Sequence, residues 1–274
     1  MSEPKSPSPL LQFALQLAGV AAAEIMPRFQ RVDVQTKSDG TPVTEADTEA
    51  ERVMRELIGV IFPDHGIMGE EHPEVLGDGE YTWVLDPIDG TASFALGIPT
   101  FGTLVALLKN GHPILGVINL PGLKETVYAE LGYGCWFLNR FGELSRQTVS
   151  TTKTLNSAMV STTGVYCTDI DPKRAKSPFN MTALIRGASK FRFVGDCLQH
   201  ALVARGLVDA AFDPEMNPWD NAAIIPCILE AGGSVSDGLG HTDNLLFAKS
   251  LLTSSTEQLH QEALDVLRPI SKFR

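Results

Sequence analysis

Residues 83–91 constrain the fold of this chain more than any other stretch, because an apolar, β-prone run ends there in two carboxylates. Asp86 and Asp89 lie three positions apart, and Pro87 between them cannot donate a backbone hydrogen bond, which interrupts any regular strand or helix. Gly90 then gives the backbone the freedom to make a tight turn. The segment therefore predicts a strand that ends abruptly in an acidic turn.

The residues after this turn predict the start of a short helix, with Thr91 at its first position and residues 92–95 behind it. Backbone N–H groups at a helix start favour an anion such as phosphate, and Asp86 and Asp89 supply the hard oxygen ligands that divalent cations prefer. A metal ion beside a phosphate group accounts for both halves of the segment. The plainer alternative is a turn in which the Asp side chains bond only their own backbone.

Three further acidic sites favour the metal hypothesis. Glu70 and Glu71 follow an apolar pair, as though a second strand also ended in carboxylates. Asp47 lies in the first turn of an expected helix that begins at Thr44, where an acid also has a plainer role in favouring the helix dipole. Asp220 opens a strongly apolar segment far downstream. If the fold brings these carboxylates together, they form a divalent-cation site.

With these motifs in register, the sequence resembles the inositol monophosphatase family of magnesium-dependent, lithium-sensitive phosphomonoesterases. The matching segments follow the family's order and typical spacings and span most of the chain; they are Val43-Thr44-Glu45-Ala46-Asp47, Gly69-Glu70-Glu71, Asp86-Pro87-Ile88-Asp89-Gly90-Thr91 and Trp219-Asp220. Within that superfamily, two further segments look most like the histidinol-phosphate phosphatase branch, namely Gly195-Asp196-Cys197 and Asp213-Pro214-Glu215-Met216-Asn217-Pro218-Trp219-Asp220.

The resemblance implies a layered α+β and α/β fold, an α-β-α-β-α sandwich of the sugar-phosphatase type. It also implies two or three Mg²⁺ ions, which would neutralise the phosphoryl oxygens and acidify the attacking water. The implied metal ligands are Glu70, Asp86, the backbone carbonyl of Ile88, Asp89 and Asp220.

The same resemblance implies roles for the residues around the ions. Glu70 and the pair formed by Thr91 and Asp47 are the expected catalytic residues, which activate the water for in-line attack without a phosphoenzyme. Gly90 and Thr91 would donate backbone hydrogen bonds to the bound phosphate at the helix start.

Asp196 and Asp213 are the expected contacts to the leaving group, and two carboxylates suit an amino-alcohol cation such as histidinol better than a neutral polyol. Asp196 also lies at an expected helix start, where capping is the alternative role. Ala92 departs from the histidinol-type pattern, which often carries Arg there. Lys37 and Ser38 belong to a loop that lies over the active site in this family, although a solvated hairpin is the plainer interpretation.

The expected reaction is therefore hydrolysis of a small-molecule phosphate monoester, with L-histidinol phosphate of histidine biosynthesis as the favoured substrate. Inositol 1-phosphate or another sugar or nucleotide phosphate is the alternative within the same class. A regulatory binding protein of the transcription machinery is the alternative of another class, but every expected metal ligand is present, which favours an enzyme. Haloacid dehalogenase-type phosphatases use Asp-x-Asp-Gly-Thr, and the two residues between Asp86 and Asp89 exclude that class.

Composition narrows the partners and the cellular location. The net charge of −11 argues against nucleic acid as a general partner, because no basic patch is available for a phosphate backbone. Four cysteines without a Cys-x-x-Cys motif predict reduced thiols, and the sequence shows neither a signal-peptide pattern nor an apolar run of transmembrane length. We therefore expect a cytoplasmic protein without a membrane partner, and the resemblance implies a homodimer.

The strand and helix patterns predict two subdomains. Residues 1–145 are expected to form an N-terminal α+β subdomain that carries most metal ligands, and its consecutive strands over 103–138 are expected to pair as an antiparallel sheet. Residues 146–274 alternate between short strands and helices and are expected to form an α/β subdomain that contributes Asp220 and the residues of substrate specificity. Asp220 is predicted to begin a helix that ends at Gly232.

Overall fold

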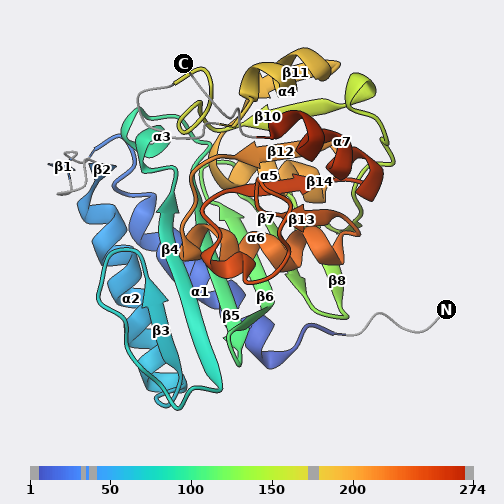
Figure 1. The fold of residues 1–274 in the computed structure, drawn as a ribbon. Helices are drawn as coiled ribbons and strands as arrows, with labels where there is room; N and C mark the ends of the chain where they lie inside the picture. Colours follow the sequence, from blue (N-terminus) through green and yellow to red (C-terminus); the bar gives the residue numbers. More distant parts are fainter. Residues whose placement is uncertain (1–5, 32–34, 37–41, 172–178, 269–274) are drawn as a thin grey trace.

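The computed structural model describes residues 6–31, 35–36, 42–171 and 179–268. Within these residues, helices and two sheets alternate in an α-β-α-β-α stack (Figure 1). The layered sandwich expected from the sequence is therefore confirmed.

The larger sheet has seven strands that lie side by side in chain order. They are β3 (Gly66–Gly69), β4 (Tyr81–Asp89), β5 (Gly102–Lys109), β6 (His112–Leu120), β7 (Glu125–Glu130), β8 (Gly134–Leu138) and β9 (Leu144–Gln147). Every neighbouring pair is antiparallel except β3 and β4, which are parallel. A separate antiparallel pair is formed by β1 (Gln35–Thr36) and β2 (Pro42–Val43).

The smaller sheet has five strands in the order β11-β10-β12-β14-β13. They are β10 (Met159–Thr162), β11 (Lys190–Phe193), β12 (Ala210–Asp213), β13 (Ser234–Ser236) and β14 (Leu251–Ser254). The β10 strand pairs in parallel with both β11 and β12, whereas β14 runs antiparallel to β12 and β13. This sheet is mixed, as expected from the alternation of short strands and helices.

Helices cover both faces of each sheet. They are α1 (Pro9–Ile25), α2 (Glu45–Ile61), α3 (Thr91–Ala95), α4 (Met181–Gly187), α5 (Asp196–Ala204), α6 (Pro218–Glu230) and α7 (Glu257–Leu267), with the 3-10 turns η1 (Leu155–Ser157) and η2 (Leu245–Phe247). The first two helices pack on one face of the large sheet, α5 and α6 lie between the sheets, and α4 and α7 cover the outer face of the small sheet (Figure 1).

The large sheet is buried on both faces, which explains why its central strands read as continuous apolar runs. Along β4 the side chains alternate, so that Trp83 and Leu85 pack toward α1 and α2. Val84 points the other way and packs toward α6, together with Ile118 of β6. The end of β4 is therefore held between two helical layers.

Two element boundaries differ from the sequence-based expectation. The β4 strand continues to Asp89, because Asp89 pairs again with Gly102 after a register shift that follows Asp86. This irregularity lies at Pro87, as expected of a residue that cannot donate to the ladder. The last internal helix, α6, begins at Pro218 and not at Asp220, because proline fits the first helical turn.

The proposed division into two subdomains at residues 145 and 146 stays a prediction. The β9 strand, Leu144–Gln147, crosses that boundary while it remains part of the large sheet. The central hydrophobic core also combines residues from both halves, such as Ile118 and Ile228.

Candidate active site

Three carboxylates meet where the end of β4 faces the start of α6. Asp86 and Asp89 come from β4, and Asp220 comes from the first turn of α6. Their nearest carboxylate oxygens all lie within 4.8 Å of one another. The fold therefore brings together side chains that are separated by more than a hundred positions in the sequence.

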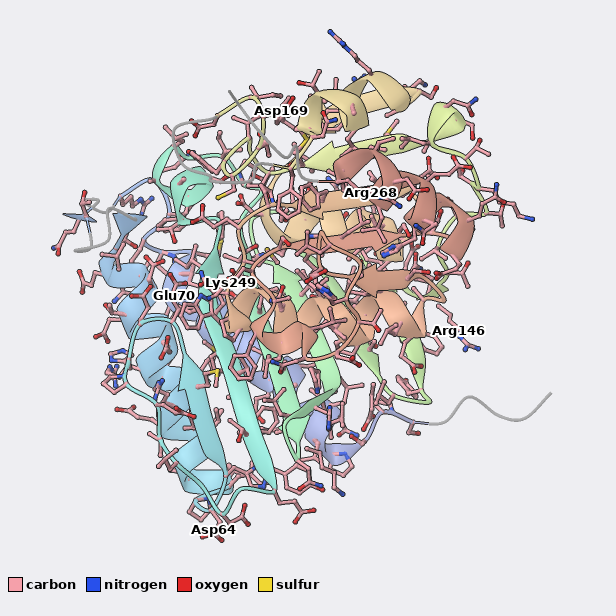
Figure 2. All side chains as sticks on the ribbon, in the orientation of Figure 1. Asp64, Glu70, Arg146, Asp169, Lys249 and Arg268 are labelled. Carbon is pink, nitrogen blue, oxygen red and sulfur yellow. The ribbon has the colours of Figure 1, made fainter. Side chains whose placement is uncertain are left out.

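Glu70 and Ile88 lie at the same pocket. Glu70 follows β3 (Figure 2). Its backbone N–H donates to Leu85 O of β4 over 3.3 Å. Ile88 has a buried side chain, and its carbonyl accepts a hydrogen bond from Thr91 Oγ1 over 3.0 Å. The residues that line the pocket are Glu70, Asp86, Ile88, Asp89, Gly90, Thr91, Ala92, Asp196, Asn217, Trp219 and Asp220.

Close packing of α6 on the large sheet sets the position of Asp220. A side chain at Gly116 of β6 would overlap the backbone of Ala223, so only glycine allows α6 to approach this closely. Within the helix, Asp220 Oδ2 accepts a hydrogen bond from the backbone N–H of Asn217 over 2.7 Å. One oxygen of this carboxylate thus caps the helix, and the carboxylate is held toward Asp86 and Asp89.

Asp47 combines a capping role with a contact to the acidic pocket. Its Oδ2 accepts hydrogen bonds from the backbone N–H and the hydroxyl of Thr44, which caps α2. Its Oδ1 accepts a hydrogen bond from Thr91 Oγ1 over 3.1 Å. Asp47 therefore both caps α2 and contacts Thr91, the two roles that the sequence suggested as alternatives.

The turn at Gly90 requires glycine for two reasons. Its φ of 87° lies in the left-handed region, and a Cβ there would lie 2.5 Å from Asp196 Oδ2. Thr91 follows as the first residue of the short helix α3, as the sequence predicted. Asp196 is the first residue of α5, behind the N-cap Gly195, and its Oδ2 accepts a hydrogen bond from Ser93 Oγ over 3.0 Å.

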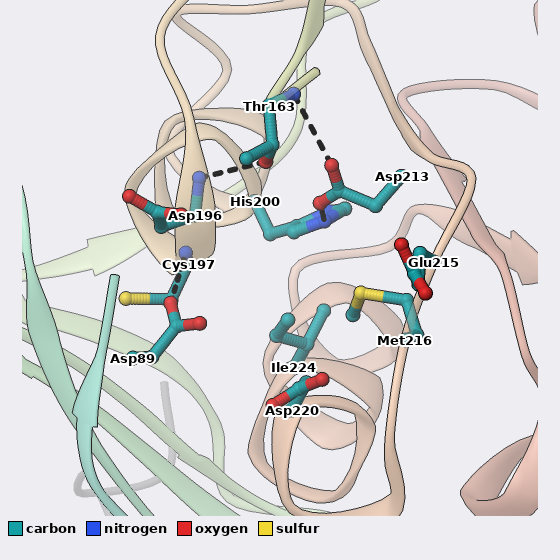
Figure 3. A pocket seen from close by; sticks show the side chains of 10 residues that line it. All are labelled: Asp89, Thr163, Asp196, Cys197, His200, Asp213, Glu215, Met216, Asp220 and Ile224. Atoms are coloured by element: carbon teal, nitrogen blue, oxygen red, sulfur yellow. Dashed lines mark hydrogen bonds and ion pairs between the residues drawn. The ribbon is translucent and has the colours of Figure 1, made fainter. Parts of the chain in front are cut away.

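A second, adjacent pocket is lined by Asp213, a residue that is 4% exposed (Figure 3). Its Oδ2 contacts His200 Nε2 at 2.9 Å and accepts from Gln199 Nε2 at 2.6 Å, while its Oδ1 accepts from the Thr163 backbone N–H at 3.2 Å. The two pockets share three acidic residues, namely Asp89, Asp196 and Asp220. Asp213 therefore faces the neighbouring space and not the cluster itself.

Burial and mutual repulsion disfavour the charged forms of these carboxylates in the absence of a cation. Burial, followed by Glu70 and Asp89, raises the pKa of Asp86 well above its usual range. Burial also raises the pKa of Asp89, of Asp196 to about 6 and of Asp220 to about 7. The site therefore has an electrostatic demand for positive charge.

A divalent cation fits that demand. Asp86 Oδ1 is buried and has no hydrogen-bond partner, which is costly for a carboxylate oxygen unless an ion or a proton satisfies it. Among the described residues that line the two pockets, none is a lysine or an arginine. The donors are carboxylate and carbonyl oxygens, which suit Mg²⁺ or Ca²⁺ and not a thiolate-preferring metal.

Sequence patterns did not reveal several contacts of the site. The backbone N–H of Cys197 donates to Asp89 Oδ2, and Ser93, Thr163, Gln199 and His200 orient Asp196 or Asp213. The sequence signal for Gln199 and His200 was that they form a polar pair inside the otherwise apolar run of α5. Lys37 and Ser38 lie outside the described residues.

Comparison with known proteins agrees with this geometry. A model of the inositol monophosphatase family matches residues 6–272. Histidinol-phosphatase from Chlorobaculum parvum is 40% identical over 236 residues, covering 85% of this chain and 87% of that protein. Fructose-1,6-bisphosphatase/inositol-1-monophosphatase from Thermotoga maritima is 36% identical over 263 residues, covering 95% and 96% respectively. The solved Thermotoga maritima IMPase matches with a TM-score of 0.83 at 32% identity, covering 95% of this chain and 97% of that chain.

The fold and the acidic pocket define a metal-dependent phosphatase that acts on small phosphate monoesters. This chain belongs to the inositol monophosphatase family. The resemblance drawn from the sequence motifs is thus confirmed. In the part of the chain that the structure describes, no helix combines the length and apolar character needed to cross a bilayer.

Proposed function

We propose that this protein is a Mg²⁺-dependent phosphomonoesterase that hydrolyses L-histidinol phosphate to L-histidinol. The observation that carries the choice of substrate is the acidic lining of the pocket beside the carboxylate cluster. Asp196, Asp213 and Glu215 line this pocket, and none of its described lining residues is a lysine or an arginine. A protonated amine on the leaving group would be attracted to these carboxylates, whereas a neutral polyol gains no such attraction.

Two or three Mg²⁺ ions are the proposed cofactor. The proposed ligands are Glu70, Asp86, the Ile88 carbonyl, Asp89 and Asp220, and all five residues line one pocket. When bound, Mg²⁺ supplies Lewis-acid stabilisation of the phosphoryl oxygens and the leaving alkoxide, and it lowers the pKa of a coordinated water.

The protein's own residues supply position and proton transfer. Thr91, oriented by Asp47, and the Glu70 carboxylate are the proposed groups that hold and deprotonate the attacking water. Gly90 and Thr91 form the wall at the start of α3, where their backbone N–H groups are the proposed phosphate donors. Asp196 and Asp213 are the proposed contacts to the leaving group.

A phosphate-release assay on the purified chain tests the proposal, with L-histidinol phosphate, inositol 1-phosphate and a nucleoside monophosphate compared with and without Mg²⁺ and Li⁺. We expect Mg²⁺-dependent, Li⁺-inhibited turnover with the highest kcat/KM for L-histidinol phosphate. Faster turnover of inositol 1-phosphate would overturn the choice of substrate. Undiminished turnover after removal of divalent cations by EDTA would overturn the metal dependence.

Inositol 1-phosphate or another sugar or nucleotide phosphate is the second candidate substrate. The observation in its favour is Ala92, which lines the pocket where histidinol-type relatives often carry Arg. A regulatory role in transcription is a further alternative. An Asp86→Asn variant that retained a protein partner while losing turnover would support that role.

A cytoplasmic homodimer is the proposed state of the protein. Its support is twofold: none of the four cysteines, all of them described by the structure, is in a disulfide, which fits a reducing compartment, and the family resemblance implies a dimeric assembly. Light scattering of the purified chain at several concentrations should give twice the chain mass; a monomer at every concentration would contradict the homodimer.

A further inference from the structure

The backbone that follows Glu70 is fastened to helix α2 by Glu51. This glutamate is fully buried, and both of its carboxylate oxygens accept backbone hydrogen bonds. Its Oε2 accepts from the N–H of Glu71 over 2.8 Å, and its Oε1 accepts from the N–H of His72 over 3.2 Å. A buried carboxylate is therefore used to hold two consecutive amides directly after a proposed metal ligand.

Arg55 holds the same backbone segment from the carbonyl side. Its Nε donates to Glu51 Oε1 over 2.7 Å, which pairs the buried carboxylate with a cation. Its Nη2 donates to His72 O and its Nη1 to Pro73 O, each over 2.9 Å. The planar guanidinium thus bonds one carboxylate and two carbonyls at once, which a lysine ammonium could not reproduce in the same geometry.

Further contacts fix the segment on its other sides. The N–H of Glu70 donates to Leu85 O of β4 over 3.3 Å. His72 Nε2 lies 3.0 Å from Thr48 O of α2. We call the hydrogen bonds that Glu51 and Arg55 make to the backbone of residues 71–73 the clamp. A side chain at Gly69 would overlap the Glu51 carboxylate, so residue 69 must be glycine for the clamp to form. The backbone is therefore held in place both before Glu70, at Gly69, and after it, at residues 71–73.

Asp47, Glu51 and Arg55 follow one another at four-residue intervals, which places them along one face of α2. Asp47 orients Thr91, and the next two residues orient the backbone beside Glu70. One helix therefore sets the relative positions of Thr91 and Glu70, which approach the pocket from separate segments of the chain.

We propose that Glu51 and Arg55 are positioning residues for Glu70. They hold its carboxylate at the acidic pocket through the backbone of residues 71–73. The inference rests on the proposed function only in treating Glu70 as a metal ligand. Neither Glu51 nor Arg55 lines the acidic pocket, so their effect on the site is exerted through Glu70.

The test compares Mn²⁺ binding by the full chain in the variants Glu51→Gln, Arg55→Lys and Glu70→Gln, followed by electron paramagnetic resonance of the free ion. We expect Arg55→Lys and Glu51→Gln to weaken Mn²⁺ binding by about tenfold, the range typical of residues that orient a metal ligand, and Glu70→Gln to weaken it at least as much. At saturating Mg²⁺ we expect a lower kcat with KM for the phosphate ester changed less than about twofold, because the clamp does not touch the leaving group.

Arg52→Gln is the matched control, since Arg52 is an exposed arginine on the same helix, where it pairs with Glu49 and Glu56. It should bind Mn²⁺ as the unmodified chain does. Hydrogen exchange at the amides of Glu71 and His72 provides a second readout in the metal-free protein, and it should accelerate in Glu51→Gln and not in Arg52→Gln. These comparisons remain decisive even if none of the phosphate esters in the assay is hydrolysed.

If Glu51→Gln does not fold, Arg55→Lys tests the positioning role by itself, because the lysine keeps a positive charge beside the buried carboxylate. Mn²⁺ affinity within about twofold of the unmodified chain in Arg55→Lys, when Glu70→Gln shows a clear loss, would overturn the positioning role. Mn²⁺ affinity unchanged by Glu70→Gln would also overturn it, because the clamp would then have no metal ligand to position.

Discussion

Thr91 Oγ1 donates a hydrogen bond to Asp47 Oδ1 over 3.1 Å, and this contact joins the first residue of α3 to the first turn of α2. The same hydroxyl lies 3.0 Å from Ile88 O, so its single proton is shared between two possible acceptors. A cation at the Ile88 carbonyl would compete for that oxygen and leave Asp47 as the acceptor. With either acceptor, the hydroxyl oxygen keeps lone pairs that can accept a hydrogen bond from a water molecule.

Thr91→Ala should therefore lower kcat by about 10²–10⁴-fold, the range typical of a group that takes part in proton transfer. Thr91→Ser keeps the hydroxyl and should retain most of the turnover. Both variants are measured by phosphate release at saturating Mg²⁺. Equal activity in the alanine and serine variants would show that the hydroxyl has no part in the reaction.

Asp89→Asn should abolish most turnover and yet stabilise the metal-free protein. The substitution removes a metal ligand, so kcat/KM should fall by more than about a hundredfold. It also removes a carboxylate whose negative charge and those of Asp86 and Asp220 repel one another. Thermal unfolding in EDTA should therefore shift to a higher temperature, while the stabilisation produced by Mg²⁺ in the unmodified chain should disappear.

Asp64→Asn is the matched control for that experiment, since Asp64 is an exposed carboxylate at the far end of α2 (Figure 2). It should change neither the turnover nor the response to Mg²⁺. A lower unfolding temperature for metal-free Asp89→Asn would contradict the repulsion argument.

The buried carboxylates of the site should make the metal-free protein less stable as the pH rises from 4 to 8. Burial raises the pKa of Asp196 to about 6 and that of Asp220 to about 7 in the folded state. A raised carboxyl pKa contributes stability that is complete below the unfolded value of about 4 and is lost as the pH passes through the folded values. Urea unfolding in EDTA measures this trend, and the addition of Mg²⁺ at pH 8 should restore stability. A metal-free protein that gained stability between pH 6.5 and pH 8 would refute the prediction.

Asp213→Asn should reduce turnover of a cationic substrate more than turnover of a neutral one. Asp213 already accepts from three donors, which leaves about one of the roughly four acceptor positions of its carboxylate for a ligand. Loss of a charged hydrogen bond costs about 1.5–3 kcal/mol, or about 10–100-fold in kcat/KM.

The comparison uses L-histidinol phosphate and glycerol 2-phosphate, whose leaving group is neutral. The ratio of their kcat/KM values should fall by about tenfold or more in Asp213→Asn. An equal loss of kcat/KM for both substrates would show that the substitution disturbs the pocket in general and that Asp213 does not discriminate by the charge of the leaving group.

Local sequence patterns were sufficient to predict the elements around the acidic cluster. The apolar run before Asp86, the proline at position 87 and the glycine at position 90 each act through the backbone of their own segment, so the strand, its irregularity and the turn follow from them. The approach of Asp220 to Asp86 is a different matter. It depends on the packing of α6 against Gly116, and its prediction required the family resemblance.

The clamp and the second pocket could not be predicted in this way. Glu51 reads as one more acidic residue on an amphipathic helix, and only the fold shows that it is buried against the loop after Glu70. His200 likewise lies in a short apolar helix, where its partner Asp213 becomes apparent only when β12 is placed beside α5. Long-range hydrogen bonds of this kind leave almost no local pattern in the sequence.

His260 should make the protein sensitive to acid independently of the metal site. It is buried between α7 and the small sheet, where Nδ1 lies 2.8 Å from Ser254 Oγ and Nε2 lies 2.8 Å from Ser236 Oγ. Burial lowers the pKa of this imidazole to about 4. A lowered histidine pKa contributes stability that is present above the unfolded value of about 6.5 and is lost as the pH falls toward 4.

The loss assigned to His260 should reach about 2–3 kcal/mol between pH 6.5 and pH 4.5, since each unit of pKa shift corresponds to about 1.4 kcal/mol. His260→Gln isolates this contribution, because the carboxylates of the metal site titrate alike in both proteins and cancel when the two unfolding free energies are subtracted. The variant should be the less stable protein at pH 7, where it lacks one of the serine contacts, and its deficit should shrink as the pH falls to 4.5. A deficit that stayed constant over this range would show that His260 is already protonated in the folded protein or that it titrates with an ordinary pKa.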